Sequence, residues 1–367
     1  MKDPRQDPPD TDEIAGLRAR IGEVNRGMLG LLNQRAELVL KIREAKERMG
    51  LPLFAPEREQ EMLDALLRDN PGPFSDSTLR HLFVEIFRAS LDLMQVQASR
   101  GLQVSRRPGL PDVVIQAAGA TLGGPVPVIV AGPCAVESEE QVEEVAAALS
   151  KMGVRFLRAG AWKPRTSPYE FQGLGVEGAR YLAAAGRRHG MATVTEVVDA
   201  RSAEDAAALV DILQVGTRNM SNFELLKTVA GLGRPVLLKR GFAATIEEYL
   251  KAAEYVAAAG NDQVILCERG IRTFERATRF TLDVSAVPIL RQESRLPVLV
   301  DVSHAAGRRD LLPALARAAL AAGASGVMVE VHPRPDLALS DARQQLDFAA
   351  FASLLQAVQP FLSGPCR

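Results

Sequence analysis

The segment 163–169 (KPRTSPY) has the composition of a phosphate-binding loop. It places the cations Lys163 and Arg165 beside the hydroxyl side chains of Thr166 and Ser167. Two prolines disfavour an α-helix here and stiffen the loop. A guanidinium fork, an ammonium group and neutral hydroxyl donors in a rigid loop match the oxygens of a phosphate group. The alternative interpretation is a basic surface turn. The other side chains that gather around this segment in the fold distinguish a phosphate site from such a turn.

Further charged side chains follow short apolar runs in the second part of the chain. Eight runs have the character of β-strands, and alanine-rich helical patterns separate them: 126–131, 156–160, 192–197, 212–216, 235–241, 264–270, 296–304 and 326–332. Continuous apolar strands that alternate with helices are typical of a parallel sheet. Eight such units predict an α/β fold, the (β/α)8 TIM barrel, in which the residues after each strand line the active face.

One group of these side chains offers the donor atoms of a metal site. Cys134 follows the first run, His304 ends the seventh, Glu330 lies near the end of the eighth, and Asp341 comes after it. A sulfur, an imidazole and two carboxylates form a mixed coordination sphere for a divalent metal. Each residue also has a structural interpretation, as a buried apolar thiol, a helix cap or a solvated acid. His332 is a competing imidazole.

The second group consists of cations that converge on the same mouth: Arg158, Lys163, Arg165, Arg218, Lys239 and Arg269. In a chain of formal net charge −1, this density predicts a ligand with several anionic groups, either two phosphates or a phosphate and a carboxylate. Lys239 has a second interpretation, as the Schiff-base lysine of an aldolase. The neighbouring Arg240 fits anion binding equally well.

The bulk composition excludes several classes of protein. With 367 residues, 47% of them hydrophobic, the chain is long enough for about two domains. Neither half has an extended basic run, so we expect no nucleic-acid or membrane partner, and no apolar run reaches membrane length. Three scattered cysteines do not form a disulfide framework, which favours the reduced cytoplasm. Residues 1–11 are expected to be disordered and do not resemble a signal peptide.

The sequence divides into a helical domain (12–98), a linker and lead-in (99–124) and the barrel (125–367). An apolar stripe from residue 14 to residue 45 predicts a first helix of about 35 residues in a small all-α domain of three helices. Arg18, Arg35 and Lys46 share one face of this helix, and the first and last are about 42 Å apart. No single metabolite spans that distance. If all three bind one kind of ligand, Arg18 must serve a neighbouring chain, which predicts an intertwined dimer.

Several segments of the second part together resemble 3-deoxy-D-arabino-heptulosonate-7-phosphate (DAHP) synthase of the short-barrel branch. They are AGPCAVES (131–138), GAWKPRTSPYEFQGLG (160–175), VGTRNM (215–220), LLKRG (237–241), ILCERGIRTFE (265–275), DVSHAAGRR (301–309), VMVEVHPRP (327–335) and ALSD (338–341). The resemblance implies a transferase that begins the shikimate pathway of aromatic amino acid biosynthesis. It would condense phosphoenolpyruvate with erythrose 4-phosphate and release phosphate.

The resemblance also implies roles for the residues sorted above. Cys134, His304, Glu330 and Asp341 correspond to ligands of a divalent metal such as Mn, Fe, Co or Zn. The family's phosphoenolpyruvate-binding residues correspond to Arg158, Lys163, Arg218, Lys239 and Arg269. The residues that bind the phosphate of erythrose 4-phosphate in that family correspond to Arg165 and Thr166. We expect Lys163, Cys134 and His304 to be catalytic, with Lys163 as proton donor. The alternative is octulosonate 8-phosphate synthase, which resembles this barrel but differs where this chain has KPRTS.

Residues 12–97 resemble an all-helical chorismate mutase domain. The resemblance rests on Arg18, Arg35, Lys46, Arg58 and Glu59 and on the segment 82–90. It implies chorismate or prephenate as ligand or allosteric effector, and a homodimer through the helices; a further barrel contact would give a homotetramer, by analogy with the family. Ala55 and Met94 replace an Asp and a Gln or Glu of that family. We therefore expect ligand binding rather than fast turnover. A true mutase, or helices that serve assembly only, are the alternatives.

Overall fold

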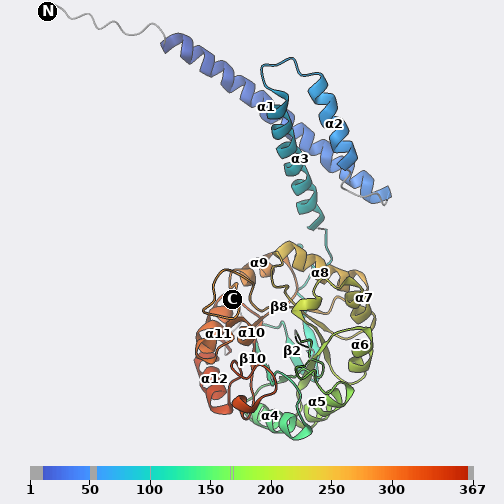
Figure 1. The fold of residues 1–367 in the computed structure, drawn as a ribbon, viewed down its shortest axis with the longest axis vertical. Helices are drawn as coiled ribbons and strands as arrows, with labels where there is room; N and C mark the ends of the chain where they lie inside the picture. Colours follow the sequence, from blue (N-terminus) through green and yellow to red (C-terminus); the bar gives the residue numbers. More distant parts are fainter. Residues whose placement is uncertain (1–10, 50–55, 100, 166, 168, 363–367) are drawn as a thin grey trace, which may run out of the picture. The chain divides into compact units, whose positions relative to one another are not determined.

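The computed structural model describes residues 11–49, 56–99, 101–165, 167 and 169–362. The chain divides into two compact units between Gly101 and Leu102. The first is helical and the second is a barrel of strands surrounded by helices (Figure 1). The predicted fold class, a TIM barrel preceded by an all-α region, is therefore confirmed. No helix in the described ranges combines the length and the apolar character that spanning a membrane requires.

In its described part, the first unit consists of helices α1 (Thr11–Met49), α2 (Pro56–Arg68) and α3 (Asp76–Ser99). Leu63, Phe87 and Met94 are buried between them. The apolar stripe of α1 lies mostly on the surface of the single chain, with Val24 62% and Leu31 67% exposed. This helix of 39 residues therefore buries little of its apolar surface within one chain.

The second unit contains a closed barrel of eight parallel strands in the described chain. The strands are β3 (Val128–Gly132), β4 (Phe156–Arg158), β5 (Ala192–Val197), β6 (Ile212–Val215), β7 (Val236–Lys239), β8 (Val264–Glu268), β9 (Val298–Asp301) and β10 (Gly326–Glu330). Seven of them lie within the predicted runs, and β3 extends one residue past the first run, to Gly132. The strands are buried almost throughout because side chains cover both faces of a barrel sheet. β10 pairs with β3 and closes the barrel.

Helices follow the strands and surround the barrel (Figure 1). They are α4 (Glu139–Lys151), α5 (Val176–His189), α6 (Ala200–Ala207), α7 (Phe223–Gly231), α8 (Ile246–Ala258), α9 (Ala286–Glu293), α11 (Leu312–Ala321) and α12 (Phe348–Leu362). Side-chain caps begin several of them, such as Ser138 at α4 and Thr245 at α8. Short 3₁₀ turns occupy Thr217–Asn219, Arg309–Leu311 and Pro335–Leu337. The active-face loops therefore start from a rigid frame.

Two local features differ from the sequence prediction. The segment predicted as a linker and lead-in contains a hairpin, β1 (Ile115–Ala117) and β2 (Ala120–Leu122), which belongs to the second unit. The seventh predicted strand does not extend to His304, because β9 ends at Asp301 and the short helix α10 (Val302–Ala306) follows. The carboxylate of Asp301 accepts a hydrogen bond from the backbone nitrogen of His304 and caps this helix.

Candidate functional site

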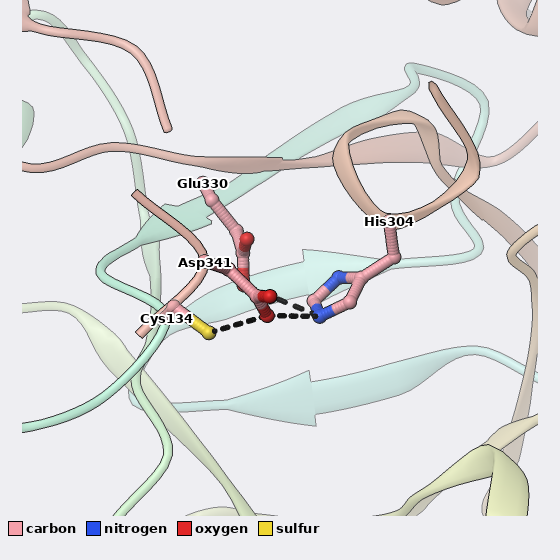
Figure 2. Close-up of side chains that lie close together, drawn as sticks. All are labelled: Cys134, His304, Glu330 and Asp341. Carbon is pink, nitrogen blue, oxygen red and sulfur yellow. Dashed lines mark hydrogen bonds and ion pairs between the residues drawn. The ribbon is translucent and has the colours of Figure 1, made fainter. Parts of the chain in front are cut away.

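Cys134, His304, Glu330 and Asp341 come together at the carboxyl ends of the strands (Figure 2). One ligand atom from each lies within 4.8 Å of those of the other three. Nε2 of His304 is 3.4 Å from Oε1 of Glu330 and 3.7 Å from Oδ2 of Asp341. The thiol of Cys134 is 3.2 Å from the same oxygen of Asp341. His332 lies outside this cluster, where its ring contacts Glu137.

The backbone around Cys134 requires glycine at the end of β3. Gly132 has a φ of 151°, and a Cβ there would approach the carbonyl oxygen of Arg158 to 2.2 Å. The end of β3 can therefore approach the neighbouring strand β4 this closely only with glycine. The next residues turn out of the strand, and the backbone nitrogen of Cys134 donates to the side-chain oxygen of Gln345. This local geometry fixes the position of the thiol.

The electrostatics of the cluster favour a cation. Burial raises the pKa of the Cys134 thiol to about 12, with the charge of Glu330 acting in the same direction. Burial opposes ionisation of Asp341, but the charges of His304 and Arg279 outweigh it and lower the pKa of this carboxyl. Burial also lowers the pKa of the His304 imidazole, despite its acidic neighbours. A neutral imidazole, two carboxylates and a thiol fit a divalent metal of intermediate softness.

A second layer of side chains orients the cluster. The buried Asp301 contacts Nδ1 of His304 at 2.8 Å and pairs with the amine of Lys239. A carboxylate behind a histidine fixes which ring nitrogen faces the metal. The amide of Gln344 donates to Oε2 of Glu330 at 2.6 Å. Sequence reasoning assigned no role to Asp301 or Gln344, although the spacing of Asp301 and His304 is that of a helix cap.

A polar cavity of about 450 Å³ adjoins the cluster. Five of the six predicted cations line it: Lys163, Arg165, Arg218, Lys239 and Arg269. Arg158 lies deeper, where it donates to Glu330 at 2.9 Å and contacts Gln214. Thr166 lies outside the described residues. The lining residues that sequence reasoning missed include Phe242, Arg272, Arg279 and Phe280.

Two cations in the cavity have buried donors without partners in the described structure. Arg269 is buried, and its Nε and Nη1 atoms have no hydrogen-bond partner there. Arg165 donates through Nε to the carbonyl of Phe171, while its buried Nη2 likewise lacks a described partner. Buried donors of this kind are costly. The cavity is therefore suited to an anionic ligand that supplies the acceptors.

The position of Lys239 bears on the Schiff-base interpretation. Its amine is buried and forms an ion pair with Asp301. The pKa of this carboxyl is well below its ordinary value, because His304 and Lys239 outweigh the effect of burial. A Schiff-base lysine requires a free amine, whereas the amine of Lys239 is occupied by the carboxylate of Asp301. The contact therefore supports anion binding over imine formation.

The helical unit brings together part of its predicted site. Arg35 donates to the hydroxyl of Ser90 and lies 5.0 Å from the ring centre of Phe87. Burial lowers the pKa of Arg35, and the charge of the nearby Glu59 opposes the shift. Arg58 instead pairs with Glu61 on the exposed surface.

The remaining predicted positions of the helical unit are dispersed. Arg18 precedes Arg35 by about 26 Å along α1 at 1.5 Å per residue, and Lys46 lies in the last turn of that helix. Met94 is buried one turn after Ser90, and Ala55 lies outside the described residues.

Residues 112–362 match the model of the DAHP synthetase I family. The chain belongs to this family. Residues 17–95 also match the chorismate mutase type II model. Both resemblances seen in the sequence are therefore confirmed: the chain is an enzyme of the DAHP synthase family with an N-terminal chorismate mutase domain, an arrangement compatible with two activities.

The relatives of this chain distinguish between the two predicted branches. A phospho-2-dehydro-3-deoxyheptonate aldolase of Thermotoga maritima is 54% identical over 256 residues, covering 70% of this chain and 76% of the relative. The crystal structure of the T. maritima DAHP synthase superposes with a TM-score of 0.69 at 53% identity, covering 71% of this chain and 76% of that one. A 2-dehydro-3-deoxyphosphooctonate aldolase of Rhodopseudomonas palustris is 33% identical, covering 68% and 93%. The octulosonate alternative is not favoured.

Proposed function

We propose that the barrel condenses phosphoenolpyruvate with erythrose 4-phosphate in a metal-dependent reaction that yields DAHP and inorganic phosphate. The observation that carries the proposal is one cavity that joins the four-residue cluster to cations with unsatisfied donors. A ligand with several anionic groups would satisfy these donors. The family places this aldol-type condensation at the start of the shikimate pathway.

Cys134, His304, Glu330 and Asp341 would hold the divalent ion, with Mn, Fe, Co and Zn all compatible with the donor set. When bound, the ion supplies Lewis acidity toward the aldehyde of erythrose 4-phosphate. Asp301 keeps the imidazole of His304 in the orientation that binding requires. Arg158 and Gln344 hold the two oxygens of Glu330 in place.

The chain's own cations would position the reactants. Arg218, Lys239 and Arg269 would bind the phosphate and carboxylate of phosphoenolpyruvate, while Arg165, with Thr166, would bind the phosphate of the aldose. This arrangement directs C3 of phosphoenolpyruvate toward the aldehyde carbon. As the carbon–carbon bond forms, water adds at C2, and the bond between C2 and the phosphate oxygen then breaks.

Lys163 is the proposed proton donor to the aldehyde oxygen. Its amine lies 3.2 Å from the sulfur of Cys134 and lines the cavity, so it stands between the cluster and the bound anions. Lys163→Met should then lower kcat strongly while the metal content stays at that of the wild type. A variant that loses the metal together with its activity would instead assign Lys163 a structural role.

The experiment that tests the barrel compares two aldoses. Consumption of phosphoenolpyruvate is measured with erythrose 4-phosphate and with arabinose 5-phosphate, each before and after treatment with a chelator. We expect activity with the four-carbon aldose only, loss of activity after chelation and recovery when a divalent metal returns. Preference for arabinose 5-phosphate, or full activity in the chelator-treated protein, would contradict the proposal.

For the helical unit we propose binding of chorismate or prephenate as a feedback ligand, with weak mutase turnover. The grouping of Arg35, Glu59 and Ser90 supports an anion site. The buried Met94 places a thioether one turn from Ser90, where a hydrogen-bond donor would serve catalysis. The exposed apolar stripe of α1 favours a homodimer through the helices. Contact between barrels would make a tetramer.

The free, buried thiols of Cys134 and Cys267 suit the reducing environment of the cytoplasm.

Three measurements separate these possibilities. Prephenate should inhibit condensation, the rate of chorismate turnover should be low, and sedimentation should show at least a dimer. Turnover at ordinary enzyme rates would contradict the weak-catalyst proposal. Failure of prephenate to bind or inhibit would instead favour helices that serve assembly alone.

A further inference from the structure

Two phenylalanine rings stack on each other in the wall of the barrel cavity. Phe242 follows β7 and Phe280 follows β8, and their ring centres are 5.1 Å apart with planes inclined by 11°. Guanidinium groups surround this pair. Arg269 lies 4.1 Å from the centre of Phe280 and 5.1 Å from that of Phe242. The other contacts are Arg218 at 5.7 Å and Arg272 at 5.0 Å from Phe242, and Arg279 at 6.0 Å from Phe280.

The buried arginines of the barrel are held in two different ways. Arg158 pairs with Glu330 at 2.9 Å, and Arg240 pairs with Glu268 and Asp283, both at 2.8 Å. Arg269 is only 4% exposed, yet none of the ion pairs in the described structure involves it, and its Nε and Nη1 have no described hydrogen-bond partner. Aromatic rings replace the carboxylate beside this arginine.

This difference has a chemical consequence. A carboxylate holds a guanidinium by its edge and occupies its N–H donors. An aromatic ring attracts the cation over its face and leaves the edge donors available. An arginine held only by rings can therefore be fixed in place and still present its N–H groups to an anion. Burial also lowers the pKa of Arg269, although the nearby charge of Asp301 opposes the shift, so an anionic ligand would further favour the charged guanidinium.

The backbone keeps the two rings in register with Arg269. The nitrogen of Phe280 donates to the carbonyl of Ala305, and the nitrogen of Arg272 donates to the carbonyl of Phe242. Gly270, next to Arg269, has a φ of 88°, and a Cβ there would approach the Cβ of Phe280 to 2.7 Å. The loop thus packs closely against Phe280 without a side chain between them.

We propose that the Phe242–Phe280 pair positions Arg269, and with it Arg218, to bind phosphoenolpyruvate. The pair acts through these arginines and does not touch the reacting atoms, so both phenylalanines are positioning residues. This inference rests on the proposed function, because phosphoenolpyruvate is the anion that the cavity is proposed to bind. The pair determines the affinity for that substrate rather than the rate of the chemical step.

The test uses four variants of the full chain. Phe280→Leu and Phe242→Leu remove a ring but retain an apolar side chain, whereas Phe280→Tyr retains the ring. Phe274→Leu is the matched control, because Phe274 lies in the same loop and is 95% exposed. The measurements are kcat, KM for each substrate, the thermal unfolding midpoint, and the dissociation constant of inorganic phosphate by calorimetry.

We expect Phe280→Leu to raise KM for phosphoenolpyruvate about tenfold, which corresponds to about 1.4 kcal/mol, with kcat and KM for erythrose 4-phosphate unchanged. Phe280→Tyr and Phe274→Leu should behave like the wild type. An unchanged KM for phosphoenolpyruvate in both Phe280→Leu and Phe242→Leu would overturn the inference. Equal increases in KM for both substrates in Phe280→Leu would also overturn it, as would a raised KM for phosphoenolpyruvate in Phe280→Tyr. Either result would indicate a structural role.

The activity of the wild-type enzyme separates a failure of the proposed function from a failure of the positioning role of the phenylalanine pair. If this enzyme does not condense the two substrates, the proposed function fails, and the phosphate measurement alone decides the inference. Weaker phosphate binding in Phe280→Leu than in Phe274→Leu would still support the positioning role. Equal binding in these two variants would end it.

Discussion

Replacing Asp301 by asparagine should weaken metal binding without removing a metal ligand. The carboxylate of Asp301 contacts Nδ1 of His304 at 2.8 Å, accepts from the backbone nitrogen of His304 at 3.0 Å and pairs with Lys239. Asparagine has almost the same shape but no charge, and its single oxygen cannot serve all three groups. The imidazole then loses the partner that fixes its orientation toward the cluster.

Two magnitudes follow from these contacts. Loss of a carboxylate behind a metal-binding histidine typically weakens metal affinity by about 10-fold to 100-fold, or about 1.4–2.8 kcal/mol. The variant also leaves the amine of Lys239 buried without its partner, and breaking a buried pair costs about 3–5 kcal/mol of folding stability. The metal-free variant should therefore unfold at lower denaturant concentration as well.

The assay is a titration of the metal-free protein with Zn²⁺ or Mn²⁺ in competition with a chromophoric chelator. Asp283→Asn is the control, because Asp283 pairs with a buried arginine at 2.8 Å but contacts no residue of the cluster. The double variant Lys239→Met/Asp301→Asn should recover stability but not metal affinity. Wild-type affinity in a folded Asp301→Asn protein would refute the reasoning.

Three further predictions concern the other parts of the site. Gly132→Ala should abolish metal binding and activity, because the added Cβ would meet the carbonyl of Arg158 at 2.2 Å; metal analysis and a condensation assay measure this. Metal affinity should rise about tenfold per pH unit between about pH 6 and 8, because binding displaces the proton of the Cys134 thiol, whose pKa is about 12. Arg35→Met should abolish prephenate binding, measured by calorimetry, because it removes the partly buried cation of the helical site.

Each of these predictions has an outcome that contradicts it. Full activity of Gly132→Ala would show that the close approach of Gly132 to Arg158 can relax. A metal affinity that does not change with pH would mean that the thiol is already ionised in the metal-free protein. Prephenate binding of wild-type strength by Arg35→Met would place the effector site elsewhere.

Much of the barrel could be predicted because its strands are buried on both faces. The run 212–216, for example, is apolar except for the buried Gln214, and β6 occupies Ile212–Val215. The charged residues that follow such runs necessarily meet at one rim, so the sequence order alone grouped Cys134 with Glu330. This argument needs only the direction of the strands.

Other features depend on tertiary contacts that leave no periodic pattern. The hairpin of β1 and β2 has strands of three residues in a segment rich in glycine, which is too short for an alternation signal. His304 was assigned to a strand because the apolar run continues past Asp301, whereas the cap at Asp301 starts a helix there. Phe242 and Phe280 lie in loops, and their significance appears only when the rings stack.

The placement of Cys134 and Glu330 links metal content to the lifetime of the protein. Cys134 follows the first strand of the barrel and Glu330 ends the last, and these two strands lie side by side where the circle closes. An ion held by both residues would fasten the first and last strands of the barrel to each other, a link that the unfolded chain lacks. The free energy of unfolding would then increase with the concentration of free metal. A cell deprived of that metal would then lose the activity of the protein and also, through proteolysis, the protein itself.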